Sequence, residues 1–264
     1  MKIKKRLLKK IKIPFFSVIT VVKNDKKNID TTIKSIKAQN FRNFEYLIID
    51  GKSTDGTLKK LKKYKRIISL LISEKDKGIY FAMNKGAKSA NGKVIVYVNS
   101  GDILKKNALN KIHKKFLENK NFDFIFGTVM RHYKTDSILK SGFNAHKLKY
   151  NFDFATAHST GFFLKRKIFI KYGMFNTNFK ISADYDLYYR LILKNKILGS
   201  ATKKQDLIGV VAKGGYSSKV PFFAHLIEET KIRLNNNQNF ILIMLIFFNA
   251  IVKFVYKKAF NKWV

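Results

Sequence analysis

The stretch VIVYVNSGD, residues 94–102, is a short apolar run that ends in polar and small residues and finishes on a carboxylate. An uninterrupted run of β-branched and aromatic residues is typical of a strand buried within a sheet. A carboxylate just beyond a buried strand is unfavourable unless it is solvated, paired or bound to a cation. Asp102 is therefore either a cation ligand, with Asn99 and Ser100 as further oxygen donors, or the N-cap of a helix that begins at Ile103.

The segments on either side of this stretch repeat its pattern. We expect strands at residues 16–22, 44–49, 67–72, 94–98 and 123–129. Between them, apolar residues keep helical spacing, in the sets Ile29, Ile33 and Ile36, then Leu58, Leu61 and Tyr64, then Ala82, Met83 and Ala87. Strands that alternate with helices predict an α/β protein with a doubly wound, mostly parallel sheet.

Acidic residues gather in the loops that follow these strands, where open α/β sheets bind their ligands. The chain has only 17 Asp and Glu, and six of them lie in these loops: Asp25, Asp50, Asp55, Glu74, Asp76 and Asp102. Asp55 or Thr54 is expected to cap the helix that follows. The concentration of acids predicts a binding site at this edge of the sheet.

The rest of the chain is strongly basic, with 54 Lys and Arg and a formal net charge of +37 over 264 residues. This charge indicates a nucleic acid, an acidic membrane face or a phosphorylated substrate, unless it reflects a compositional bias toward lysine. The lysines are dispersed and no nucleic-acid reader motif is present, so we expect no nucleic-acid partner. The absence of Cys excludes thiolate metal sites, disulfides and cysteine nucleophiles.

Beyond residue 130 the regular alternation fades, and we expect a smaller region that packs on the sheet edge and completes the site. Within it, ISADYDLYYRLIL (181–193) predicts a helix entered from a loop. Asp186 and Arg190 have the spacing of an ion pair across one helical turn.

The two ends of the chain differ from its middle. Residues 1–13 form a basic segment in which Ile3, Leu7, Leu8 and Ile11 share one helical face, without the apolar run of a secretory signal. At the other end, FILIMLIFFNAIVKFVY (240–256) is apolar but interrupted, and lysines and Trp263 follow it. Residues 220–264 are expected to form a helical, membrane-associated tail. Its apolar part from residue 240 is interpreted as an interfacial membrane anchor, with a helix docked on the body or a true membrane span as alternatives.

Five segments follow one another over residues 14–195, namely FSVITVVKN, LIIDGKSTDGT, SEKDKGIYFAMNKG, YVNSGD and SADYDLYYRL. In order and spacing they resemble family 2 glycosyltransferases of the GT-A fold, in particular the bacterial enzymes of polysaccharide and exopolysaccharide biosynthesis. The resemblance implies a GT-A domain over residues 14–219, with a Rossmann-like sheet, an acceptor-side region and a C-terminal helical tail.

The resemblance also implies an activity and its residues. It implies transfer of a sugar, with inversion, from a nucleotide sugar such as a UDP-sugar to a hydroxyl of a surface glycan or lipid-linked precursor, on the cytoplasmic face of the membrane. Asp184 matches the catalytic base, and Asp102 matches the ligand of Mg²⁺ or Mn²⁺. His158 lies in the segment that approaches the acceptor. The residues that match the donor pocket are Thr20, Val22, Asp50, Asp76, Gly78, Asn84, Asn99 and Ser100.

Three positions depart from the family's acidic pattern, namely Gly51, Phe81 and Asn99. These departures leave open a protein that keeps the fold as an inactive partner subunit. A basic nucleic-acid-binding protein is the remaining alternative.

Overall fold

The computed structural model of the protein describes residues 13–133, 136–215 and 220–260. The helix expected in the N-terminal segment, with Ile3, Leu7, Leu8 and Ile11, lies outside the described residues, as does Trp263.

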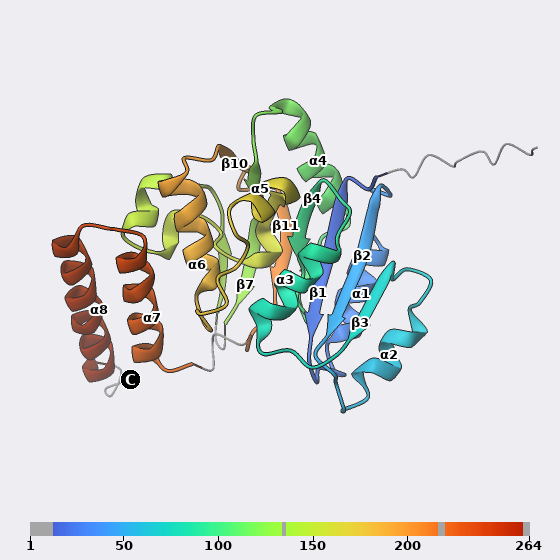
Figure 1. The fold of residues 1–264 in the computed structure, drawn as a ribbon, viewed down its shortest axis with the longest axis horizontal. Coiled ribbons are helices and arrows are strands. Elements are labelled where there is room, and N and C mark those ends of the chain that lie inside the picture. The colour runs from blue at the N-terminus through green and yellow to red at the C-terminus, as the bar shows by residue number, and fades with distance from the viewer. Residues whose placement is uncertain (1–12, 134–135, 216–219, 261–264) are drawn as a thin grey trace, which may run out of the picture.

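Within the described residues, the larger of two sheets has seven strands. Across the sheet they are β10 (Gly199–Ala201), β6 (Phe124–Phe126), β9 (Phe162–Lys165), β4 (Val94–Tyr97), β1 (Phe16–Val22), β2 (Phe44–Asp50) and β3 (Leu70–Ser73). The strands β4, β1, β2 and β3 run parallel, whereas β9 is antiparallel to both of its neighbours. The expected mostly parallel α/β sheet is confirmed (Figure 1).

Helices cover both faces of this sheet. The helices α1 (Ile29–Lys37), α2 (Thr57–Lys63) and α4 (Ala108–Glu118) pack on one face, and α3 (Ile79–Ser89), α5 (Arg166–Lys171), α6 (Ala183–Tyr188) and the π-helical turn η4 (Tyr189–Lys194) pack on the other. Alternate residues of β1 serve the two cores, since Val18 and Val22 join the first and Ile19 and Val21 the second. The doubly wound arrangement follows from this alternation.

The start of the third strand differs from the expectation. Strand β3 begins at Leu70, because Ile67 and Ile68 continue the turn that ends α2. Their N–H groups both donate to the carbonyl oxygen of Tyr64, at 3.0 and 3.3 Å.

The expected strand at 123–129 divides at Gly127 between two sheets. Residues Phe124–Phe126 form β6 of the large sheet, and Thr128–His132 form β7 of a second sheet. A Cβ atom on Gly127 would lie 2.8 Å from Ile208 Cγ1, so only glycine fits where the chain changes sheets. The order of the second sheet is β5 (Ile103–Leu104), β11 (Leu207–Val211), β7 and β8 (Ser137–Lys140).

The helix proposed to begin at Ile103 is not observed. Ile103 and Leu104 form β5, which pairs antiparallel with β11, and helix α4 begins only at Ala108. The interpretation of Asp102 as a helix N-cap is therefore wrong.

Short 3-10 helices connect the second sheet to the site and to β9. They are η1 (Ala145–Lys149), η2 (Phe152–Phe154) and η3 (Ser159–Gly161). The helix expected within residues 181–193 is present as α6 and η4, and Arg190 Nε donates to Asp186 Oδ2 at 2.8 Å as expected.

The chain ends in a pair of helices, α7 (Phe222–Asn235) and α8 (Phe240–Phe260), that lie side by side at one end of the molecule (Figure 1). The rings of Phe222 and Phe254 stack between them at 4.2 Å. Asn249 and Lys253 do not interrupt α8. Among the described residues, α8 alone is long and apolar enough to cross a membrane by length and composition, and only 6% of its most apolar window is buried.

Candidate active site

A cavity of about 770 Å³ opens beyond the carboxyl ends of β1 and β4. Segments distant in the sequence form its walls: the loop after β1, the loop after β4, residues 155–159, the start of α6 and the inner side of α7. The site therefore lies at the edge of the sheet that the acidic loops predicted.

Asp102 is held in the wall of this cavity by bonds from two distant segments. Its Oδ2 atom accepts a hydrogen bond from Thr160 Oγ1 at 2.5 Å, and its Oδ1 atom accepts one from the backbone N–H of Ala212 at 2.9 Å. The side chain of Thr32 fixes the loop, because its hydroxyl donates to the Asp102 carbonyl and accepts the Gly101 N–H. Asp102 thus has a fixed orientation, and each of its oxygens keeps a further lone pair for a ligand.

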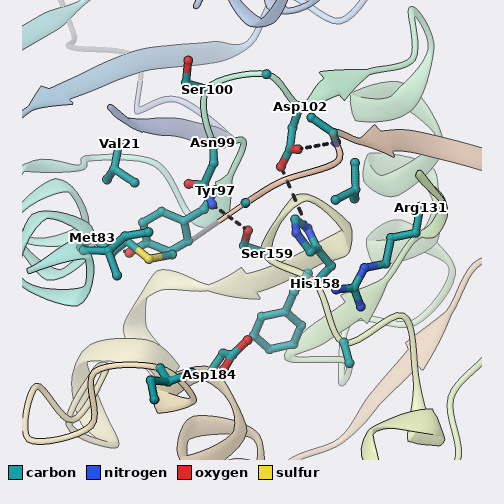
Figure 2. A pocket seen from close by; sticks show the side chains of 18 of the residues that line it. Val21, Met83, Tyr97, Asn99, Ser100, Asp102, Arg131, His158, Ser159 and Asp184 are labelled. Atoms are coloured by element: carbon teal, nitrogen blue, oxygen red, sulfur yellow. Dashed lines mark hydrogen bonds and ion pairs between the residues drawn. The ribbon is translucent and has the colours of Figure 1, made fainter. Parts of the chain in front are cut away.

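The residues beside Asp102 have the chemistry of a site for a hard cation. Asn99 Oδ1 and Ser100 Oγ are buried and accept or donate no hydrogen bond. Figure 2 shows that Ser100 points away from Asp102, whereas Asn99 lies on the cavity side. Within the described ranges, no three His, Asp or Glu side chains group as a metal site. This donor set fits Mg²⁺ or Mn²⁺, which take one or two protein carboxylates when substrate phosphates supply the other ligands.

His158 lies next to Asp102, with 4.0 Å between its Nδ1 atom and Asp102 Oδ2. Nδ1 accepts the N–H of Thr160 at 3.2 Å, so the ring caps η3. Burial lowers the pKa of His158, and the charge of Arg131 lowers it further, although Asp102 opposes both effects. His158 is therefore a neutral side chain that lines the cavity.

Asp184 enters the same cavity from the first turn of α6. Its Oδ1 atom accepts the N–H of Tyr185 at 2.9 Å and lies 3.4 Å from the hydroxyl of Tyr80. Burial raises the pKa of Asp184 to about 6, against the smaller lowering effects of these contacts and of Arg131. A carboxylate with this pKa is ionised at neutral pH and accepts a proton readily.

The two carboxylates lie in different walls of one cavity. In Figure 2, Asp102 and Asp184 enter from opposite sides, with His158 between them. Val22, Asn99 and Ser100 also line this space.

The other residues assigned to the donor pocket lie outside the cavity lining. Thr20 is buried and bonds to Val98 and Tyr46, and Asn84 bonds to the backbone of Phe175. Asp50 is also buried, and it accepts hydrogen bonds from Ser53 and Ser73.

Asp76 and Gly78 lie at the start of α3. Asp76 pairs with Lys85 at 2.6 Å through Oδ1, whereas its Oδ2 atom is buried without a partner. Gly78 is the N-cap of α3, with a φ of 158°. Asp55, the expected cap of α2, accepts the N–H of Thr57 at 2.9 Å from the residue before the N-cap.

Sequence reasoning missed several residues of the cavity. Arg131 lies on β7, where the alternating pattern had already faded, and Tyr80 lies on α3 among apolar residues. His225 and Glu229 come from α7, in the segment interpreted as a membrane tail. Their i, i+4 spacing on one helical face was the available signal.

Comparison with known proteins identifies the family. The model of the family described as Glycosyl transferase family 2 matches residues 17–173. Because this match spans more than half of the chain, the protein belongs to that family. The family resemblance is thereby confirmed, and the matched range ends before the fifth segment, SADYDLYYRL (182–191).

Individual relatives agree with this membership. The chain is 35% identical over 101 residues to a glycosyltransferase named for teichuronic acid biosynthesis, TuaG of Bacillus subtilis (strain 168). The aligned residues are 37% of this chain and 40% of TuaG, so the match covers less than half of that relative's length.

Solved structures share the fold. TarS 1-349 of S. aureus in complex with UDP-GlcNAc has a TM-score of 0.69 at 18% identity, over 94% of this chain and 76% of that chain. The mannosyltransferase PcManGT from Pyrobaculum calidifontis, in complex with GDP-Man and Mn²⁺, has a TM-score of 0.59 at 17% identity, over 84% of this chain and 63% of that chain. The expected GT-A fold is thus confirmed.

Proposed function

We propose that the protein is an inverting glycosyltransferase that moves a sugar from a nucleotide-sugar donor to a hydroxyl of a glycan acceptor. The observation that carries this proposal is that Asp102 and Asp184 line one cavity beyond the carboxyl ends of β1 and β4. Asp102 would bind the diphosphate of the donor through a cation. Asp184 would accept the proton of the attacking hydroxyl. Membership of glycosyl transferase family 2 supports this assignment.

Asp184 is the proposed catalytic base. An alcohol is a weak nucleophile, so a carboxylate within hydrogen-bond reach that accepts its proton lowers the barrier to attack. The acceptor oxygen forms its bond to the anomeric carbon as the bond to the diphosphate breaks, and the proton passes to Asp184. Attack opposite the departing diphosphate inverts the anomeric configuration.

Asp102 and Asn99 are the residues that would hold a divalent cation, Mg²⁺ or Mn²⁺. Such an ion, when bound, offsets the negative charge that develops on the leaving diphosphate. The Mn²⁺ in the PcManGT complex supports the choice of cation. Thr160 and the Ala212 N–H keep the Asp102 carboxylate oriented toward this task.

A UDP-sugar is the proposed donor, and the TarS complex with UDP-GlcNAc supports it. Val22, Asn99 and Ser100 line the cavity as donor contacts. Asp76 keeps an unpartnered buried oxygen that suits a nucleoside hydroxyl or base N–H. Thr20 and Asp50 are buried, whereas Gly78 is the N-cap of α3 and Asn84 lies within it, and all four would shape the nucleotide pocket without lining the cavity.

The proposed acceptor is a surface glycan or its lipid-linked precursor, and the proposed location is the cytoplasmic face of the membrane. The name of TuaG supports a cell-surface polysaccharide. Helix α8 exposes an apolar surface, and Lys253, Lys257 and Lys258 follow the most apolar turns. An apolar helix with a basic end suits peripheral attachment to an anionic bilayer.

We divide the chain into a basic segment (1–13), a GT-A domain (14–219) and a helical tail (220–264).

A donor screen tests the proposal. Purified protein is incubated with a panel of UDP-, GDP- and dTDP-sugars, with and without Mn²⁺, and release of the nucleoside diphosphate is measured. We expect release from a UDP-sugar that depends on Mn²⁺ and is lost in Asp184→Asn. If every donor stays intact while nucleotide still binds, the chain is an inactive partner subunit and the proposal is wrong.

A further inference from the structure

Glu229 on α7 is a carboxylate without a partner in the wall of the cavity that holds Asp184. It is only partly exposed, and it makes no hydrogen bond or ion pair with any residue in the described ranges. The neighbouring Glu228 behaves differently. Its carboxylate accepts the N–H groups of Lys180, Ile181 and Ser182 at 2.9, 2.7 and 2.6 Å, and so anchors the loop before Asp184.

A carboxylate in this position is unfavourable in the protein without its ligand. Taking an ionised group out of water costs free energy unless hydrogen bonds or an opposite charge compensate for it. Burial raises the pKa of Glu229 to about 7, and the charge of Asp184 raises it further, against the lowering effect of Arg233. Packing does not explain this side chain, because an apolar residue would fill the same space without that cost.

A second polar side chain of the cavity lining also lacks a hydrogen-bond partner. Thr156 is 1% exposed, and its Oγ1 atom is buried without a hydrogen-bond partner. Thr156 and Glu229 come from different segments, and both belong to the lining of the cavity that Asp184 enters. Two unsatisfied polar groups in one cavity indicate a ligand with several hydrogen-bonding groups.

The carboxylate of Glu229 indicates which chemical groups the ligand has. A carboxylate accepts hydrogen bonds from hydroxyl groups and repels phosphate, so a diphosphate does not suit this wall of the cavity. A sugar ring offers adjacent hydroxyls that one carboxylate can bind together. We propose that Glu229 is an acceptor-binding residue, which accepts hydrogen bonds from the ring hydroxyls of an acceptor sugar and sets the reacting hydroxyl against Asp184.

This inference rests on the proposed function and extends it, because it names a neutral sugar ring as the part of the acceptor bound beside the base. It also assigns α7 to the acceptor site. The helix whose outer side packs on α8 thus has its inner side in the cavity.

The experiment separates donor turnover from acceptor binding. Hydrolysis of the UDP-sugar selected by the donor screen reports on the donor site alone. Transfer from the same donor to octyl β-glucoside, octyl β-galactoside and octyl β-N-acetylglucosaminide reports on the acceptor site. The variants are Glu229→Gln, which keeps the size of the side chain, and Glu229→Asp, which keeps the charge. Glu118→Gln, an exposed glutamate on α4, is the matched control.

We expect Glu229→Gln to raise the KM for the accepted glycoside about tenfold, with donor hydrolysis within about twofold of the wild type, since one charged hydrogen-bond acceptor is lost. Glu229→Asp should recover part of this loss, and Glu118→Gln should behave as the wild type. An unchanged acceptor KM overturns the inference, as does a rise in the donor KM alone. It is also overturned if the wild type hydrolyses the donor but transfers to none of the three glycosides. Absence of donor hydrolysis in the wild type contradicts the proposed function instead.

Discussion

The hydroxyl of Tyr80 donates a hydrogen bond to the carbonyl oxygen of Ile181 at 2.8 Å and thereby joins α3 to the loop before Asp184. Tyr80 is buried, and its ring packs against Phe175 with the centroids 5.2 Å apart. One phenol group therefore links α3 to the segment that leads into α6 in the wall of the cavity.

Tyr80→Phe tests this connection. The substitution leaves the Ile181 carbonyl without its donor, so we expect the free energy of unfolding to fall by about 1 kcal/mol. We also expect kcat to fall more than the donor KM rises, because the position of Asp184 is loosened while the donor contacts remain. Urea denaturation and steady-state kinetics measure the two effects. Tyr150→Phe, which removes a phenol from an exposed tyrosine, is the control and should change neither.

The activity should depend on the ionisation of Asp184. Its pKa is raised to about 6, and a base acts only when it is deprotonated. We therefore expect kcat/KM to rise with pH through about 6 and then to level. Asp184→Asn should reduce kcat by about 10² to 10⁴-fold with nearly intact nucleotide binding. A profile that stays flat from pH 5 to pH 8 would contradict this role.

The same carboxylate should reduce the stability of the fold at neutral pH. The pKa of Asp184 is higher in the folded protein than its ordinary value of 3.8, so the folded state binds the proton more tightly than the unfolded state. Stability from this group is present at low pH and is lost as pH rises from about 4 through 6. We expect Asp184→Asn to be more stable than the wild type at pH 8 by about 2 kcal/mol, and to lose this advantage near pH 4. Thermal unfolding at both pH values measures the difference.

Asp102→Asn should affect both the loop and the response to metal. An amide provides only one oxygen acceptor, so the hydrogen bond from Thr160 or the one from Ala212 is lost. We expect the free energy of unfolding to fall by about 1 to 3 kcal/mol. The Mn²⁺ concentration for half-maximal nucleotide release should also rise, which a Mn²⁺ titration measures. Asp206→Asn, which removes a partly exposed ion pair with Lys111, should leave that concentration unchanged.

The apolar side chains of α8 should be needed for attachment to membranes. Ile241, Leu245 and Phe248 share one helical face and are 57% to 69% exposed. We expect their combined replacement by Ser to move the protein from anionic phosphatidylglycerol vesicles to the supernatant in a sedimentation assay. Donor hydrolysis should persist, because α8 contributes no residue to the cavity. Equal sedimentation of the variant and the wild type would exclude α8 as the attachment site.

The sequence predicted the parallel half of the fold well, because each strand there is a distinct apolar run. It was wrong at Ile103 and at residue 127 for a common reason. Both errors concern the second sheet, where β11, far along the chain, supplies the partner. A helical pattern after Asp102 carried no information about that pairing, since a strand of two residues has no periodicity of its own.

The candidate site was predicted where a strand end or a family motif marks it, and it was missed where packing alone creates it. Asp102 follows a buried strand and Asp184 was selected by the family resemblance, and both line the cavity. Glu229 lies in α7, within the segment 220–264 interpreted as a membrane-associated tail, and only the folded chain brings it into the cavity that Asp184 enters. Asp50 stood out as an acid at a strand end, but the structure shows it buried against Ser53 and Ser73, which local sequence does not reveal.

The hydrogen bond from Ala212 to Asp102 joins residues 110 positions apart. A chain leaving the ribosome folds its N-terminal part first. The loop that presents Asp102 therefore receives this backbone partner late in biosynthesis, after the parallel strands β1 to β4 have been synthesised. We expect nascent chains that end before residue 212 to contain these strands with an unfinished pocket.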